Sequence, residues 1–332
     1  MTMTMTMTMT MTKSMLSLCA AAGIAATTLV PTLAAAQDWP KAPVRIILPF
    51  TPGGGDQVFR IITPLLQEKW KQPVVIEYKP GASNIIATDY IVKSKPDGYT
   101  IGVTGATVAN NPLFYKNIPY TYDDFSGITR VVNLEMALVA RNDAPFNSIP
   151  ELVAHAKANP GQLNWGTGGL GATYAGFRQF MYASGIDMVH VNFPGWSQAL
   201  SELMGGRLDL VINPHDSSVQ FVKANRMKMI ASFGPKRIAG FEKVPAVNES
   251  YAGVDITPYL AFIAPKGTPS PVLQKIHLDT AQVLNEPAVK RQLADLGLNV
   301  ATSTPEETDR SFRSETVEWA RIARQIKLPP PQ

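Results

Sequence analysis

The chain has 332 residues, of which 45% are apolar, 17% charged and 8% aromatic, and its formal net charge is +4 at pH 7. This composition suits one large or two ordinary globular domains, and it excludes a disordered chain, a collagen-like repeat and a chain-long coiled coil. The single cysteine, Cys19, excludes a disulfide scaffold.

The first 36 residues have the pattern of a secretory signal peptide. After a Met/Thr repeat over residues 1–12, Lys13 precedes an uncharged run of small and apolar residues that ends at Ala34-Ala35-Ala36. A basic start, a short apolar segment and an A-x-A site predict cleavage after Ala36 and a mature chain in the periplasm. Because Cys19 lies inside this segment, the mature chain would have neither a thiol nucleophile nor a cysteine-based zinc site.

Charge and histidine placement narrow the possible partners of the mature chain. Lys13 is the one charged residue in the predicted signal, so a weak positive excess remains, and no run of Lys or Arg indicates a nucleic-acid surface. No other stretch approaches about 18 apolar residues, so no membrane-spanning helix is predicted. The four histidines lack H-E-x-x-H or any tight pairing, so we expect no metal and no cofactor.

Strands that run into glycine-containing loops and then helices recur along the chain. Residues 44–50, VRIILPF, form a near-continuous apolar run typical of a strand buried on both faces of a parallel sheet. A loop at 51–56 follows, and apolar residues at helical spacing over 58–70 predict a helix that Asp56 would cap. Pro64 is expected to kink this helix or shift its start. The same order recurs at 74–84 and 99–107.

A second strand–helix series begins near residue 135. Ser148-Ile149-Pro150-Glu151 is a capping box that predicts a helix ending at 159–161. Further strands are expected within 163–173, 188–196 and 208–218. From Tyr259 onward a strand leads into two helices, the last opened by a capping box at 304–307. Two such series indicate an α/β chain with two lobes.

Two glycine-rich loops, 52–55 and 166–171, each lie between a predicted strand and a predicted helix. A helix N-terminus presents unpaired backbone N–H groups and partial positive charge, and glycine lets an anion approach that backbone closely. If the loops face each other across a cleft, they would hold a carboxylate or phosphate from both sides. The alternative is that these glycines serve only tight turns.

Two enzyme interpretations remain weaker alternatives. Residues 166–171 contain G-x-G-x-x-G, but the next strand ends at Asn192-Phe193 without the acidic residue that dinucleotide binding needs. Gly195-Trp196-Ser197-Gln198-Ala199 is similar to a nucleophile elbow but has Ala199 where the second glycine belongs, and no histidine is clearly placed to serve Ser197.

The run W-P-x-x-P-V-R-I-I-L-P-F-x-P-G-G-G-D over 39–56 carries a family resemblance. It is followed in order by P-G-A at 80–82, P-D-G-Y-T at 96–100, N-P at 111–112, G-G-R-L-D at 205–209 and A-P-K-G-T-P at 264–269. The chain therefore resembles the Bug-type periplasmic solute receptors of tripartite tricarboxylate transporters over residues 38–325.

This resemblance implies a fold and a role. The fold is the type II (Venus-flytrap) periplasmic binding protein, with mixed sheets flanked by helices in two lobes, expected here at 37–139 with 260–332 and at 140–259. Such a receptor is not an enzyme; as a monomer it closes on a small carboxylate and delivers it to membrane permease subunits. In similar receptors the loops matching 52–56 and 167–173 hold the carboxylate, largely through backbone N–H groups and bridging waters.

The expected site combines these loops with neighbouring polar residues. In the first lobe the ligand-binding residues are expected to be Pro52, Gly53, Gly54, Gly55, Asp56, Ser83, Thr104 and Thr107. In the second lobe they are expected to be Thr167, Gly168, Gly171, Ala172, Thr173, Arg178, Asn192, Phe193, Trp196, Asn213, His215 and Asp216.

Departures from the family pattern suggest the ligand class. Trp196 stands in a segment where relatives usually have a lysine, His215 and Asp216 follow the strand where an Asp-Asn pair is usual, and Arg178 replaces a common glutamate. An arginine fork can bind a carboxylate bidentately, although a surface ion pair with Asp187 or Glu202 is the alternative. We expect a dicarboxylate, with an aromatic one such as terephthalate as a candidate. A ligand-sensing receptor and, less favoured, a serine hydrolase are the other functions considered.

Overall fold

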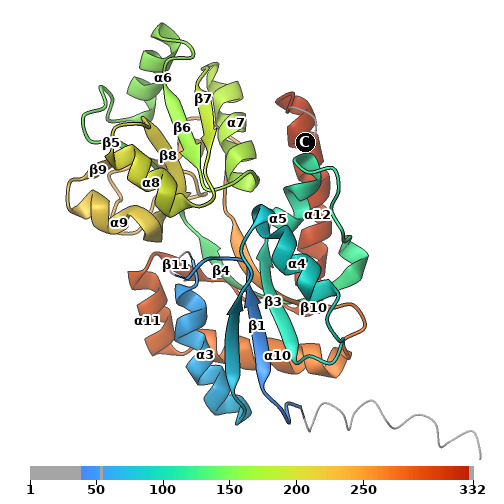
Figure 1. Cartoon of the computed structure of the whole chain (residues 1–332). Coiled ribbons are helices and arrows are strands. Elements are labelled where there is room, and N and C mark those ends of the chain that lie inside the picture. Colours follow the sequence, from blue (N-terminus) through green and yellow to red (C-terminus); the bar gives the residue numbers. More distant parts are fainter. Residues whose placement is uncertain (1–38, 53–54, 329–332) are drawn as a thin grey trace, which may run out of the picture.

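The computed structural model describes residues 39–52 and 55–328, which form two lobes, each built on one mixed sheet flanked by helices (Figure 1). The six-stranded sheet of the first lobe, at the bottom of Figure 1, has the order β11-β4-β10-β3-β1-β2. The five-stranded sheet of the second lobe has the order β7-β6-β8-β5-β9. Alternating strands and helices thus produce the two α/β lobes that the sequence pattern predicts.

The elements of the first lobe come from both ends of the described chain. Its strands are β1 (Val44–Leu48), β2 (Val74–Tyr78), β3 (Thr100–Gly105), β4 (Phe125–Leu134), β10 (Tyr259–Pro265) and β11 (Leu298–Val300). Its helices are α3 (Gln57–Trp70), α4 (Ile85–Val92), α5 (Thr107–Asn110), α10 (Ser270–Leu284), α11 (Pro287–Asp295) and α12 (Pro305–Gln325). Short 3₁₀ turns cover Ala82–Asn84, Asn111–Leu113 and Tyr122–Asp124.

The second lobe is formed by the middle of the chain. Its strands are β5 (Met136–Arg141), β6 (Asn164–Thr167), β7 (Val189–Asn192), β8 (Leu210–Pro214) and β9 (Met227–Ser232). Its helices are α6 (Ile149–Ala158), α7 (Ala172–Ser184), α8 (Trp196–Met204) and α9 (His215–Lys223), and a 3₁₀ turn lies at Val247–Glu249. A buried group of aromatic rings that includes Trp165, Phe177 and Phe233 fills the space between the sheet and α7.

The chain passes between the sheets twice. The first passage is short: β4 ends at Leu134, and Met136 already pairs with Pro214 of β8. The boundary expected between 139 and 140 therefore falls inside β5, whose partners β8 and β9 both belong to the second sheet. Sequence patterning could not mark this point, because the two apolar strands are separated by Glu135 alone. The second passage covers 233–258, between β9 and β10.

The helix starts follow the predicted caps only in part. Thr304 and Glu307 form the expected capping box of α12, and Ser148 accepts a hydrogen bond from the backbone N–H of Glu151 at the start of α6. Asp56 occupies the cap position of α3, but its side chain makes no capping hydrogen bond. Pro64 lies inside α3 without shifting its start. None of the helices in the described part of the chain is long and apolar enough to cross a membrane.

Candidate functional site

Each sheet directs the carboxyl ends of its parallel strands toward the other lobe (Figure 1). In the first sheet these are the ends of β1, β2 and β3, and in the second the ends of β6, β7 and β8. Ligands of open α/β sheets bind outside such ends. Most of the expected site residues lie in the loops that follow these strands, so the topology gathers them along one junction between the lobes.

The loop after β1 is organised by Asp56. This side chain is fully buried, and its Oδ2 accepts hydrogen bonds from Arg60 Nε at 2.6 Å and Tyr78 Oη at 2.7 Å. Asp56 therefore orders the loop by tying it to α3 and to β2. Gly55 has φ of 104°, which favours glycine, and Pro52 is exposed. Gly53 and Gly54, also expected in the site, lie outside the described residues.

The loop after β6 leads into the N-terminus of α7. Gly171 is the N-cap, and the backbone N–H groups of Ala172 and Thr173 begin the helix. The first N–H groups of a helix have no partner within it, which suits them to bind an anion. Thr167 shapes this loop, because its Oγ1 donates to the carbonyl of Gly169 at 2.9 Å and also contacts His190 Nε2 at 2.8 Å.

Gly168 seats this loop directly against the start of α8. A Cβ on Gly168 would lie 2.5 Å from the backbone nitrogen of Trp196 and 2.8 Å from its ring Cγ. The Trp196 indole N–H is buried and has no hydrogen-bond partner within the described residues. Three sources of hydrogen-bond donors thus lie together around one glycine loop. They are the backbone N–H groups in the first turn of α7, those in the first turn of α8, and this indole N–H.

The two lobes touch at this junction. Ser83 Oγ donates across it to the carbonyl of Leu170 at 3.0 Å. A Cβ on Gly171 would lie 3.5 Å from Thr107 Cγ2 and 3.6 Å from Asn110 Oδ1, both of the first lobe. The rings of Phe114 and Tyr174, one from each lobe, have centroids 5.7 Å apart. Residues of the two lobes are therefore in direct contact at this junction.

A strained turn presents Ser83 to the second lobe. Ala82, Ser83 and Asn84 have φ of 47°, 48° and 73°, a left-handed conformation that costs non-glycine residues about 1 kcal/mol or more each. Side chains hold the turn in place: Asn84 Nδ2 donates to Thr107 Oγ1, and Asn111 Nδ2 donates to the carbonyl of Ser83. Such strain persists only where surrounding contacts impose it, and it is typical of functional loops.

Buried polar atoms without a partner gather at the same edges of the sheets. A buried polar atom normally has a hydrogen bond, so a group of exceptions at one place marks that place as a candidate binding site. In the described part of the chain, such atoms at the junction are Thr104 Oγ1, Asn110 Nδ2 and Oδ1, Asn111 Oδ1, Trp196 Nε1, Asn213 Oδ1 and His215 Nδ1. They come from both lobes and include donors as well as acceptors.

Two of these residues, Asn213 and His215, lie close to the passages between the lobes, and the expected Asp216 follows them. Asn213 is the next-to-last residue of β8, and its Nδ2 donates to the carbonyl of Pro214. The backbone N–H of His215 donates to the carbonyl of Glu135, the residue of the first passage. A Cβ on Gly297, the residue before β11, would lie 2.9 Å from the His215 ring. Asp216 follows in the first turn of α9.

Three further expected residues lie in β7, directly after it and in α7. Asn192 is exposed at the end of β7, and Phe193 packs beside Gly166 in an apolar cluster of the second lobe. Arg178 is the seventh residue of α7, and within residues 39–52 and 55–328 it forms no ion pair. The surface pair considered for it is absent, because Glu202 pairs with Arg207 instead.

Burial shifts the pKa values of three groups here. It lowers the pKa of His190 to about 4, with a smaller contribution from the nearby charge of Arg178. It also lowers the pKa of His215 to about 4 and raises that of Asp216 to about 6. At neutral pH both histidines are therefore uncharged, and His190 can act as a hydrogen-bond partner of Thr167 without placing a positive charge in the aromatic cluster.

The His190 shift predicts a pH dependence of stability. Because its pKa in the fold lies below the unfolded value of 6.5, the unfolded chain binds more protons at pH 4–6.5, so this contribution to stability falls as the pH falls through that window. His190→Phe keeps the ring contacts with Trp165 and Tyr174 but cannot titrate. When the pH is lowered from 7 to 5, we expect the free energy of unfolding of His190→Phe to fall by about 1 kcal/mol less than that of wild type. This difference corresponds to roughly 2–4 °C in Tm.

Calorimetric Tm values at pH 5, 6 and 7 check this expectation. His215 titrates in the same direction in both proteins, and Asp216, with its raised pKa, contributes in the opposite direction in both. A variant whose Tm falls as steeply as that of wild type would contradict the assignment to His190.

Sequence reasoning missed residues that the structure brings to the junction. Asn110, Tyr115 and Tyr174 were not expected there, yet Tyr115 Oη lies 2.8 Å from Ser83 Oγ and Tyr174 packs on Phe114. One signal was present: Asn110 ends the short helix that follows β3 and precedes the family motif Asn111-Pro112. No group of three or more metal-binding side chains is gathered anywhere in the part of the chain that the structure describes.

Comparison with known proteins identifies the family. Residues 58–328 match the family model described as the tripartite tricarboxylate transporter family receptor. The chain belongs to this receptor family. It is 31% identical over 314 residues, 92% of this chain and 94% of the other, to the UPF0065 protein in the tcbD-tcbE intergenic region of Pseudomonas sp. (strain P51).

Solved structures of similar receptors support the same family and fold. The Rhodopseudomonas palustris protein Rpa4515, solved with adipate, superposes with a TM-score of 0.84 at 25% identity and covers 89% of this chain and all of its own. MatC (Rpa3494) of the same organism, solved with bound malate, has a TM-score of 0.76 at 25% identity, covering 86% and 99%. The two-lobed fold and the family that the sequence motifs predict are thus confirmed. Members are solute-binding receptors rather than enzymes.

Proposed function

We propose that this receptor captures a small organic dicarboxylate in the periplasm, after removal of residues 1–36, and delivers it to the membrane permease subunits of a tripartite tricarboxylate transporter. The observation that carries this proposal is the convergence of donors at one place between the lobes: the first turns of α7 and α8 and the buried, unpaired indole N–H of Trp196. Similar receptors were solved with adipate and with malate, both dicarboxylates.

Binding would proceed by closure of two lobes about the passages at Glu135 and at 233–258, with the protein acting as a monomer. In this mechanism one carboxylate lies on the N-terminus of α7, and the first lobe closes over it. The contact from Ser83 to Leu170 and the packing of Thr107 on Gly171 then join the lobes. Hinge closure of this kind needs no covalent chemistry.

An aromatic dicarboxylate such as terephthalate is a second candidate ligand. It is favoured by the Trp196 ring, which lies against Gly168 at the start of α8 and offers a flat surface beside the donors. Aromatic pairs prefer offset or edge-to-face stacking, which a planar ligand ring could adopt on the indole.

Calorimetric titration of the mature protein tests the proposed function. Succinate, malate, adipate and terephthalate are compared with acetate, aspartate and glucose. We expect saturable binding of at least one dicarboxylate, without turnover, and no binding of glucose. Binding of the amino acid aspartate or of glucose, with failure of succinate, malate, adipate and terephthalate, would overturn the proposal, and turnover that Ser197→Ala abolishes would favour a hydrolase instead.

A further inference from the structure

Asn110 is a buried amide without a partner. It is the last residue of α5, which follows the carboxyl end of β3, and its side chain is 0% exposed. Within the described residues neither Nδ2 nor Oδ1 makes a hydrogen bond. Buried amides are normally paired because each unpaired atom has lost its water without replacement. Two such atoms on one side chain indicate that something else pairs with them when the site is in use.

The amide faces the anion-binding end of the second lobe. Its Oδ1 would lie 3.6 Å from a Cβ on Gly171, the N-cap of α7. The helix spans 13 residues, so its first N–H groups form a substantial donor site. Asn110 thus lies where a carboxylate held by Ala172 and Thr173 would meet the first lobe.

The neighbouring asparagine has a different role. Asn111 Nδ2 donates to the carbonyl of Ser83 at 3.0 Å and also approaches Tyr120 Oη, so this side chain supports the strained turn. The Asn110 side chain makes no hydrogen bond within the described residues, although it is as buried as that of Asn111. The contrast separates a structural amide from one that is free to bind a ligand.

The chemistry of a carboxamide defines its complement. Nδ2 donates and Oδ1 accepts, side by side, whereas an ionised carboxylate only accepts. A plain dicarboxylate could pair with Nδ2 but would leave Oδ1 without a donor. Thr104 Oγ1, at the end of β3, is likewise buried and unpaired in the described structure and can accept as well as donate. The first-lobe side of the junction therefore suits a ligand that carries a donor next to its carboxylate.

We propose that Asn110 is a specificity-determining residue that selects hydroxydicarboxylates, donating through Nδ2 to a carboxylate oxygen and accepting the adjacent ligand hydroxyl through Oδ1. This inference rests on the proposed function and narrows it, since it favours a hydroxylated ligand over terephthalate. A site that binds a ligand hydroxyl rejects the analogue lacking it, because its own polar atom is then left unpaired.

Matched ligand pairs test the role of Asn110. Isothermal titrations compare malate with succinate, and 2-hydroxyglutarate with glutarate, on the mature protein. Wild type is expected to bind each hydroxylated member roughly tenfold or more tightly than its partner. Asn110→Leu is expected to reduce this ratio to about one, with a smaller loss for succinate. Asn117→Leu changes an exposed amide seven residues later in the same segment and is expected to keep the wild-type ratio.

A second variant separates selectivity from structure. Asn110→Asp keeps an acceptor and the side-chain size but replaces the donor with a negative charge, so both affinities are expected to fall while the preference for the hydroxyl remains. A purely structural role would lower all affinities alike in Asn110→Leu, with the ratio unchanged, and would overturn the inference. So would a wild-type protein that binds dicarboxylates without preferring the hydroxylated member. Failure to bind any carboxylate would instead contradict the proposed function.

Discussion

Gly168→Ala is expected to weaken ligand binding roughly 30- to 100-fold. The added methyl group would lie 2.5 Å from the backbone nitrogen of Trp196 and 2.8 Å from the carbonyl carbon of Gly195, and neither backbone atom can move alone. Relieving this overlap must separate the loop after β6 from the start of α8, at a cost of about 2–3 kcal/mol. Because the donors of α7 and α8 converge only while these segments touch, we expect most of that cost to appear as lost affinity.

Gly195→Ala is the matched control on the opposite side of the same contact. Gly195 has an extended φ of −170°, and a Cβ there would have nothing within 4 Å among the described atoms. The control is therefore expected to bind within about threefold of wild type, the small loss reflecting a poorer N-cap for α8. Titration of both variants with the tightest wild-type ligand, alongside their Tm values, measures the difference. Equal affinities for the two variants would show that the loop–helix contact does not form the ligand seat.

The same contact shows what sequence reasoning could and could not provide. Gly168 and Gly171 were expected in the site because strand, glycine loop and helix follow one another in the sequence, and the structure places Gly171 at the N-cap of α7. This order of elements is a local sequence pattern, so it can be recognised without knowing the fold. Phe193 packs its ring beside Gly166 within the second lobe, a contact that the local sequence does not reveal, and its contribution to the site stays a prediction.

Contacts between distant segments were beyond sequence reasoning. The bond between Thr167 and His190, and the burial of Asn110, depend on which strands become neighbours and on how the lobes meet. The position of Asp56 before a helix predicts a side-chain cap. In the structure its carboxylate instead accepts hydrogen bonds from Arg60 and Tyr78. The capping box of α12 formed as predicted, since Thr304 and Glu307 satisfy each other locally.

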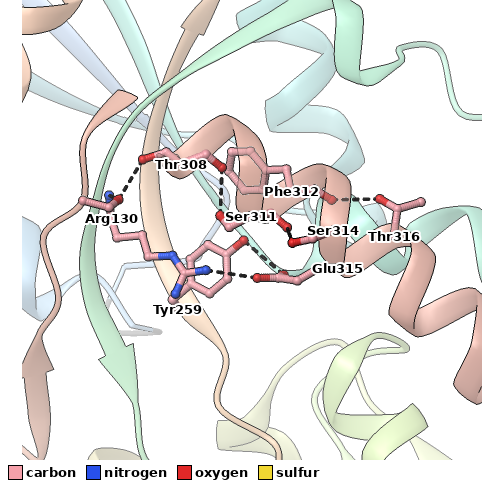
Figure 2. Close-up of polar contacts among 9 residues, drawn as sticks. Arg130, Tyr259, Thr308, Ser311, Phe312, Ser314, Glu315 and Thr316 are labelled. Carbon is pink, nitrogen blue, oxygen red and sulfur yellow. Dashed lines mark hydrogen bonds and ion pairs between the residues drawn. The ribbon is translucent and has the colours of Figure 1, made fainter. Parts of the chain in front are cut away.

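A partly buried ionic cluster beside the passages between the lobes depends entirely on contacts between distant segments (Figure 2). Arg130 of β4 lies over the ring of Tyr259, 3.8 Å from its centroid, and its Nη2 is 3.1 Å from Glu315 Oε1 of α12. Tyr259 Oη donates to Glu315 Oε2 at 3.1 Å. Burial raises the pKa of Glu315 and raises that of Tyr259 above its usual range. The cluster therefore ties the C-terminal helix to β4 and to the first residue of β10.

Arg130→Met is expected to destabilise the protein by about 2 kcal/mol at pH 7, or roughly 4–8 °C in Tm. Removing the guanidinium leaves the Glu315 carboxylate in a site that is only 24% exposed and has no other cation bonded to it in the described structure. An unpaired buried charge costs more than the pair contributed, and the partial exposure of Arg130, 27%, sets the moderate size of the effect. Arg313, also in α12, forms an exposed ion pair with Asp123. Arg313→Met removes this pair and is expected to lower the free energy of unfolding by about 0.5 kcal/mol or less.

The pH dependence distinguishes an unpaired charge from lost packing. Without Arg130 the pKa of Glu315 rises further above its unfolded value, so the fold binds a proton that the unfolded chain releases, and this contribution to stability is present at low pH and lost as the pH rises. Denaturant titrations should therefore show a smaller deficit for Arg130→Met at pH 5 than at pH 7. The double variant Arg130→Met with Glu315→Leu should recover most of the loss at pH 7, because it removes the charge itself. A deficit that is equal at both pH values, and unchanged in the double variant, would mean that Arg130 acts only through its packing on Tyr259.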